Sequence, residues 1–140
     1  MKETIRILVV DDYEPWRRFT GSTLQKQPEY QIIGGVPDGL EAVRTAQELQ
    51  PDLILLDVGL PTVNGIEAAR RIREVSPNSK VLFVSQNSSP DVVQEALNNS
   101  AAGYVVKSDA ASELLPAVEA VLEGKKFISA SLADHLVTTT

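Results

Sequence analysis

The chain has 140 residues, 43% of them hydrophobic and 23% charged, which is the size and composition of one ordinary globular domain. Its formal net charge of -6 argues against direct binding of nucleic acid, which depends on Lys and Arg neutralising phosphates, and the lack of cysteine excludes disulfides, thiolate metal sites and cysteine nucleophiles. There is no apolar run of transmembrane length and no signal peptide, so we expect a cytoplasmic protein without a membrane partner.

Short apolar runs alternate along the chain with longer runs of helical period. The predicted strands, which are rich in Val, Ile and Leu, span residues 5–10, 30–36, 53–56, 80–84 and 103–106. The predicted helices, whose apolar side chains recur every three or four residues, span 14–27, 39–50, 65–75, 91–101 and 112–123. The last helix contains Pro116, which we expect in or near its first turn, because deeper inside a helix proline costs about 3 kcal/mol.

This alternation predicts a doubly wound α/β fold. Strands so uniformly apolar are expected when helices cover both faces of a parallel sheet. We expect a flavodoxin-like three-layer sandwich with a five-stranded parallel sheet in the order 2-1-3-4-5. Residues 1–124 are predicted to form the domain. Residues 125–140 are expected to be a C-terminal extension with a short helix at 132–137, or the start of a linker to an output domain.

Polar residues follow four of the predicted strands. Asp11 and Asp12 follow the first strand, Asp57 the third, Ser85 the fourth and Lys107 the fifth. In an open parallel sheet the carboxyl ends of the strands lie along one edge, where such folds place their ligand crevice. The predicted strand order puts the first and third strands side by side. The three aspartates are therefore expected to meet at one site.

Three adjacent carboxylates repel one another, so at least one of them would be protonated unless a cation lies between them. Mg²⁺ prefers oxygen ligands in octahedral geometry, whereas the absence of cysteine and the single histidine, His135 in the tail, give no indication of zinc. With a metal holding a phosphoryl donor, an ionised aspartate can act as nucleophile and form an acyl phosphate. Lys107 is suited to neutralise phosphate oxygens, and Ser85 to donate a hydrogen bond to one of them.

Taken together, these motifs resemble those of a bacterial two-component response regulator receiver domain across residues 4–124. The matching residues, in chain order, are Asp11, Asp12, Asp57, Pro61, Gly65, Ser85, Tyr104 and Lys107. The resemblance implies a signalling domain rather than an enzyme, one that catalyses only its own phosphotransfer and the slow loss of the phosphoryl group. A sensor histidine kinase is the implied partner.

The resemblance also implies roles for individual residues. Asp57 would be the phosphoacceptor, and Asp12, Asp57 and the Gly59 carbonyl would bind Mg²⁺ directly, with Asp11 binding it through water. Ser85, Lys107 and Tyr104 would bind the phosphate or act in the switch, with the Tyr104 ring turning inward on phosphorylation. The face made by the fourth helix, fifth strand and fifth helix would then repack.

A finer resemblance points to the NarL/FixJ subfamily. It rests on Gly103 to Asp109 followed by Glu113 to Val118. Members usually continue into a LuxR-type helix-turn-helix domain, so DNA contact is expected only through a C-terminal domain that these residues lack. Homodimerisation on phosphorylation is a further expectation. The alternatives are a stand-alone receiver and a pseudo-receiver that signals by protein contact alone.

Two other functions fit the residues less well. A haloacid-dehalogenase-type phosphatase needs a second aspartate two residues after its nucleophile, where this chain has Gly59. A flavin-binding module needs a Ser/Thr/Gly-rich phosphate loop after the first strand, whereas the acidic residues at 11, 12 and 14 would repel the flavin phosphate. Single residues also have plainer interpretations: Tyr104 and Trp16 alone are most simply packing residues. The functional prediction rests on their joint placement.

Overall fold

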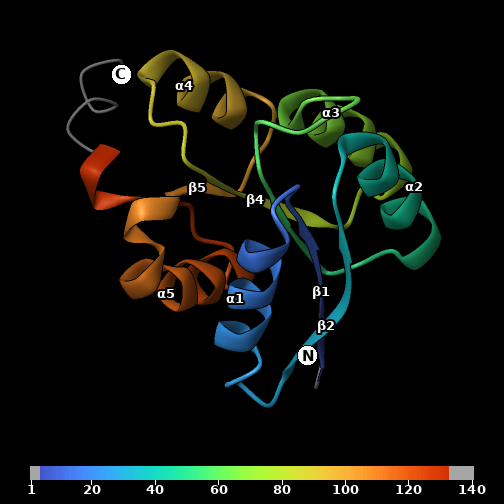
Figure 1. Ribbon diagram of the computed structural model, residues 1–140, viewed down its shortest axis with the longest axis horizontal. Helices are drawn as coiled ribbons and strands as arrows, with labels where there is room; N and C mark the ends of the chain where they lie inside the picture. The colour runs from blue at the N-terminus through green and yellow to red at the C-terminus, as the bar shows by residue number, and fades with distance from the viewer. Residues whose placement is uncertain (1–3, 133–140) are drawn as a thin grey trace.

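The computed structural model describes residues 4–132 as alternating strands and helices (Figure 1). In chain order the elements are β1 (Ile5–Val10), α1 (Glu14–Leu24), β2 (Tyr30–Val36), α2 (Gly39–Leu49), β3 (Leu53–Leu56), α3 (Gly65–Val75), β4 (Lys80–Ser85), α4 (Pro90–Asn98), β5 (Gly103–Val106), the 3-10 turn η1 (Lys107–Asp109), α5 (Ala110–Leu122) and β6 (Phe127–Ile128). No helix within the described residues is long and apolar enough to cross a bilayer.

The strands form one parallel sheet in the order β2-β1-β3-β4-β5-β6. This confirms the predicted flavodoxin-like order of the first five strands, but the prediction of five strands was wrong because β6 extends the sheet beyond β5. The sixth strand has only two residues, Phe127 and Ile128, paired with Gly103 and Tyr104. A segment of that length is too short to carry a period-two pattern.

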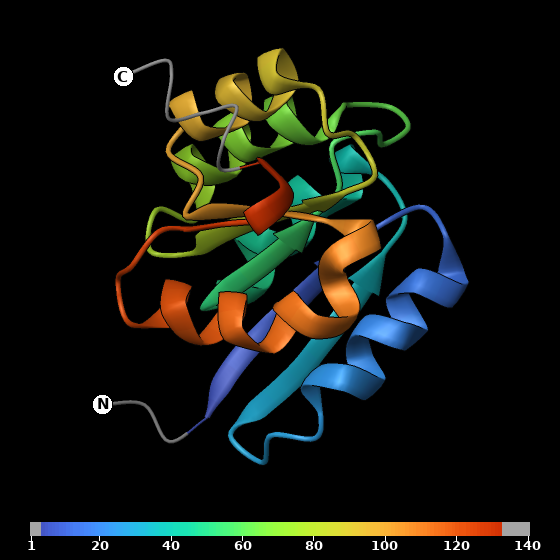
Figure 2. The same ribbon diagram turned by 90° about the vertical axis from the view of Figure 1, so that its left-hand side faces the viewer.

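Helices cover both faces of the sheet (Figure 2). On one face α1 and α5 pack over a core that includes Ile7, Leu55 and Val118, and on the other α2, α3 and α4 pack over Leu8, Ile54 and Phe83. Each strand therefore buries alternate residues in opposite cores. This explains why the strands are apolar throughout rather than alternating.

Helix α5 corrects the expectation for Pro116. The helix begins at Ala110, directly after η1, so Pro116 lies well inside it rather than near its first turn. Pro116 is exposed, and so is Ser112, the residue whose carbonyl loses its donor, so water can reach that part of the helix. Burial of Leu114, Val118 and Val121 against the sheet offsets the lost hydrogen bond.

The segment after Gly124 packs onto the domain through Ser129. The Ser129 side chain is fully buried; its Oγ accepts a hydrogen bond from the Val106 amide at 2.8 Å and donates one to Glu113 Oε1 at 2.5 Å. Leu132 is also buried, in the same core as Tyr104. Of the short helix expected at 132–137, all but Leu132 lies outside the described residues.

Replacing Ser129 with Ala is expected to destabilise the fold by about 1–3 kcal/mol, because the buried Val106 amide and the Glu113 carboxylate each lose a partner. Urea unfolding measures this loss. Ser131→Ala is the matched control, since that exposed hydroxyl donates to Asp109 and its removal should change stability by less than about 0.5 kcal/mol. Equal stabilities of the two variants would contradict the anchoring role of Ser129.

Candidate functional site

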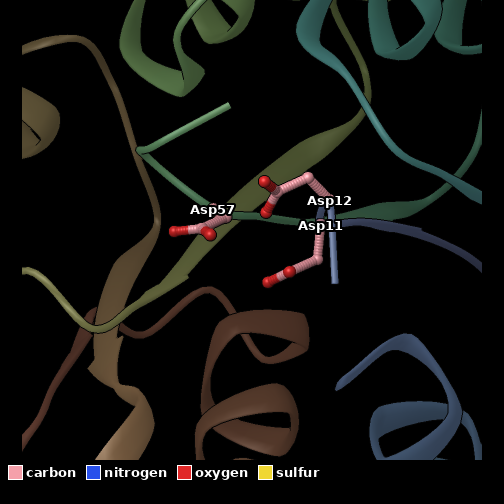
Figure 3. Close-up of side chains that lie close together, drawn as sticks. All are labelled: Asp11, Asp12 and Asp57. Carbon is pink, nitrogen blue, oxygen red and sulfur yellow. The ribbon is translucent and has the colours of Figure 1, made fainter. Parts of the chain in front are cut away.

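Three aspartates meet at the carboxyl end of the sheet, as the sequence predicted. Figure 3 shows Asp11 and Asp12, which follow β1, with their carboxylates projecting to the same side as that of Asp57, which follows β3. One carboxylate oxygen from each lies within 4.8 Å of the others, a spacing that suits a shared metal ion. Asp11 and Asp57 are buried, whereas Asp12 is exposed at the mouth of the site.

The sheet itself fixes these side chains. The Asp57 amide donates to the Val10 carbonyl at 3.1 Å, and the Asp11 amide donates to the Val36 carbonyl at 3.1 Å, so the ladder continues one residue past each strand. Neighbouring strands thus hold both backbones in register. The short distance between the carboxylates is therefore a property of the rigid sheet rather than of mobile loops.

The electrostatics of the cluster favour a bound cation. Burial raises the pKa of Asp11, and the negative charge of Asp57 raises it further, whereas hydrogen bonds from Lys107 and the Tyr13 amide act in the opposite direction. A divalent ion would stabilise the ionised form of these groups. The three carboxylates and the exposed backbone at Gly59 supply the oxygen ligands that Mg²⁺ prefers.

Lys107 reaches the acidic cluster from the end of β5. Its Nζ lies 2.6 Å from Asp11 Oδ2 and 3.4 Å from Asp57 Oδ2, and its side chain is only 11% exposed. The lysine thus bridges the two buried carboxylates. This is the juxtaposition of the first, third and fifth strand ends that the sequence predicted.

A cleft of about 640 Å³ opens above the carboxylates. Five of the predicted site residues line it, namely Asp12, Asp57, Gly59, Ser85 and Lys107. The rest of the lining comes from Tyr13, Val58, Gln86 and Asn87. A Cβ added at Gly59 would meet no atom within 4 Å, so the space beside that residue is open. The cleft can admit a phosphoryl group and its donor to Asp57.

Ser85 and Tyr104 are linked by a residue that was not predicted from the sequence. Ser85 is buried and its Oγ accepts a hydrogen bond from the Asn87 amide at 3.1 Å, while the Tyr104 hydroxyl donates to the Asn87 carbonyl at 2.6 Å. Asn87 stands two residues after Ser85, at the same sheet edge. That position was the only signal in the sequence that could have identified it.

The Tyr104 ring is fully buried, with its centroid 6.0 Å from that of Phe83. Burial raises the pKa of its hydroxyl, so the group is a neutral donor to Asn87. This inward position is the one that the family resemblance led us to expect of the phosphorylated form. Here Tyr104 also holds the loop that follows β4.

Two further residues contact the site from α1. The Arg17 side chain donates to the Asp11 carbonyl at 2.6 Å, and the Trp16 ring lies beside Lys107. Neither contact follows from the helical pattern of α1. Both depend on how the start of this helix packs against the ends of β1 and β5.

Comparison with known families agrees with this geometry. A family model described as the response regulator receiver domain matches residues 7–119. The chain belongs to this family. A receiver domain is a signalling module of two-component response regulators, and the flavodoxin-like fold and the acidic cluster described above are those of such a domain.

Several curated proteins resemble this receiver domain. The transcriptional regulatory protein DegU of Brevibacillus brevis is 32% identical over 95% of this chain and 56% of its own length. The response regulator GacA of Pseudomonas viridiflava is 33% identical over 94% of this chain and 62% of its own length. LiaR of Bacillus subtilis is 31% identical over 96% of this chain and 64% of its own length. The chain therefore spans less than two thirds of these relatives.

Solved structures give the same picture. A LuxR-family response regulator from Aurantimonas sp. SI85-9A1 superposes with a TM-score of 0.92 at 32% identity, covering 97% of both chains. The receiver domain of NarL from Mycobacterium tuberculosis superposes with a TM-score of 0.82 at 28% identity, covering 88% of this chain and 99% of that one. The resemblance to LuxR/NarL-type regulators expected from the sequence is thus confirmed.

Proposed function

We propose that this receiver domain accepts a phosphoryl group on Asp57 from a sensor histidine kinase, in a reaction that requires Mg²⁺. The observation that carries the proposal is the Asp57 carboxylate itself, which lies in an open cleft between two further aspartates and Lys107. An oxygen of Asp57 attacks phosphorus, the bond from phosphorus to the donor histidine nitrogen breaks, and the imidazole leaves as the acyl phosphate forms.

The residues present suit the metal. Asp12, Asp57 and the Gly59 carbonyl would hold Mg²⁺ directly and Asp11 through water, and the ion when bound supplies neutralisation of the phosphoryl oxygens. The protein's own contribution is to hold Asp57 in line with the incoming phosphorus and to keep Lys107 close enough to pair with a phosphoryl oxygen.

Phosphorylation would change the contacts of Ser85 and Lys107. The phosphoryl group adds about -1.5 to -2 charges and three strong acceptor oxygens. Ser85 now accepts from the Asn87 amide, and Lys107 lies closer to Asp11 than to Asp57, so a phosphoryl group on Asp57 would compete with Asp11 for the lysine and would draw the Ser85 hydroxyl toward itself as a donor. Because Tyr104 is bonded to Asn87 as well, this exchange would move the loop after β4 and the face made by α4, β5 and α5.

The output of the switch is proposed to be transcriptional. Relatives such as DegU and LiaR are named transcriptional regulatory proteins, and each extends well beyond the part that this chain matches. DNA binding would then belong to a C-terminal helix-turn-helix domain, which suits the acidic charge of the receiver. Phosphorylation-dependent homodimerisation stays a prediction, and identical light scattering with and without the phosphoryl group would contradict it.

Intact-mass spectrometry after incubation with acetyl phosphate tests the phosphorylation. A single phosphoryl adduct that forms with Mg²⁺ and not with EDTA is the expected result. The absence of an adduct under every condition would overturn the proposal and favour a pseudo-receiver that acts by protein contact. These conditions include a phosphorylated kinase domain as the donor in place of acetyl phosphate. An adduct that forms only with the kinase domain would show that Asp57 accepts the phosphoryl group from that donor alone.

Replacing Lys107 with Ala is expected to weaken the conformational response more than phosphorylation itself. The variant loses a charge-assisted contact to the phosphate, which we expect to lower the ratio of switched to resting molecules about tenfold. Amide hydrogen exchange in α4 and α5, measured with and without acetyl phosphate, reports the response. Lys125→Ala is the control, because that lysine pairs with Glu123 on the surface; an unchanged response in Lys107→Ala would refute the role of Lys107.

A further inference from the structure

Lys107 has a third neighbour besides the two carboxylates. Its Nζ lies over the Trp16 ring, 4.9 Å from the centroid, within the distance at which an ammonium is attracted to the face of an indole. Trp16 and Lys107 also line a cavity of about 400 Å³ that adjoins the cleft above Asp57. Trp16 is the only tryptophan in the chain.

We propose that Trp16 is a positioning residue for Lys107, holding the ammonium within reach of Asp57 while the acidic cluster changes its charge. The inference rests on the proposed phosphorylation of Asp57. Trp16 lines the adjoining cavity and is not part of the lining of the cleft above Asp57. It acts only through the lysine.

The argument begins with the flexibility of lysine. Lys107 carries a compact charge on a four-carbon stem, and its contact to Asp11 is shorter than its contact to Asp57, 2.6 against 3.4 Å. Once a divalent cation neutralises these carboxylates, they attract the ammonium less strongly. The indole face has no formal charge and binds no metal, so its attraction for Lys107 persists when the ion pairs weaken.

Trp16 is itself held rigidly beside the site. Its amide donates to the Tyr13 carbonyl at 3.0 Å, and the Tyr13 amide donates to Asp11 Oδ1 at 2.9 Å. Phe19, one turn further along α1, packs against the indole with ring centroids 5.0 Å apart. The backbone that carries the indole is therefore linked through Tyr13 to the same aspartate that the lysine contacts, and Phe19 packs against the ring itself.

The test compares rates of adduct formation from acetyl phosphate and Mg²⁺ in matched variants. Trp16→Leu, which keeps apolar bulk but loses the π face, is expected to slow the reaction about fivefold, the size of one partly buried cation–π contact. Trp16→Phe should restore most of the rate. Phe19→Leu, which removes the neighbouring aromatic ring of α1 and leaves the indole in place, should stay within about twofold of the wild type.

A double-mutant cycle distinguishes positioning from simple packing. If Trp16 acts through Lys107, adding Trp16→Leu to Lys107→Ala slows the reaction no further. Equal rates in Trp16→Leu and the wild type, or effects that multiply in the double variant, would overturn the inference. Circular dichroism of each variant establishes that it is folded. If Trp16→Leu does not fold, the cycle is measured with Trp16→Phe instead.

Fluorescence gives a readout that does not depend on phosphorylation. Because Trp16 is the only tryptophan, the indole emission, excited selectively over that of the three tyrosines, reports on this ring; Lys107→Gln should change its intensity by removing the ammonium from the ring, whereas Lys125→Gln should not. Identical spectra for Lys107→Gln and the wild type would refute the contact. If the wild type forms no adduct but Lys107→Gln still changes the Trp16 emission, the proposed phosphorylation is refuted and the contact between Trp16 and Lys107 stands.

Discussion

Asp57→Asn is expected to abolish the Mg²⁺-dependent phosphoryl adduct completely while the domain stays folded. The amide has nearly the same shape as the carboxylate but cannot attack phosphorus. Replacement also removes one of three like charges that lie within 4.8 Å, which relieves repulsion and compensates for the weak 3.4 Å contact to Lys107. Loss of activity should therefore come without loss of stability.

Intact-mass spectrometry and urea unfolding measure the two halves of this prediction. Asp38→Asn is the matched control: Asp38 caps α2 by accepting from the Glu41 amide, and asparagine caps helices equally well. That variant should be phosphorylated like the wild type. An adduct that survives in Asp57→Asn would place the acceptor on another carboxylate, and a large drop in stability would contradict the electrostatic argument.

Gly65→Ala is expected to have the largest effect on stability, a loss of about 3 kcal/mol or more. A Cβ at Gly65 would lie 1.9 Å from the Asp57 carbonyl oxygen and 2.8 Å from Val58 Cα, so α3 and the end of β3 would have to separate. The Gly65 amide donates to the Val58 carbonyl at 2.7 Å, a bond that this separation would break. Asp57 would move with its backbone, so phosphorylation should slow as well.

Gly21→Ala provides the contrast. Gly21 lies inside α1, and a Cβ there would meet no atom within 4 Å, so alanine should stabilise the helix by about 0.5–1 kcal/mol. Urea unfolding of both variants against the wild type measures the difference. A Gly65→Ala variant as stable as Gly21→Ala would mean that the close approach of α3 to β3 is dispensable.

Local patterns predicted much of this molecule. The strand bounds at 5–10, 30–36, 53–56 and 103–106 agree with the structure because a buried parallel strand must be apolar along its whole length. Helix ends were predicted less well. For example, α1 ends at Leu24 rather than at 27, because the apolar periodicity of a helix gives little indication of the residue at which the helix ends.

The site was predictable for a geometric reason. Parallel strands bring their carboxyl ends to one edge, so Asp11 and Asp57, which follow the adjacent strands β1 and β3, had to be neighbours once the strand order was known. Lys107 follows β5, two strands from β3, and reaches both carboxylates through its long side chain. Their chemical types then indicated a metal and a phosphoryl group.

Only the tertiary structure revealed contacts between element ends that no periodicity encodes. Among these are β6 beside β5, the hydrogen bond from Tyr104 to the Asn87 carbonyl, and the Trp16 ring under Lys107. Such contacts depend on how helices and loops pack against the sheet, and this packing involves residues from the whole chain. The sequence by itself determined five of the six strands, their order and the acidic cluster, because a buried parallel strand is apolar along its whole length and a doubly wound sheet places its first and third strands side by side. The partners that hold the lysine and the tyrosine were decided by the fold.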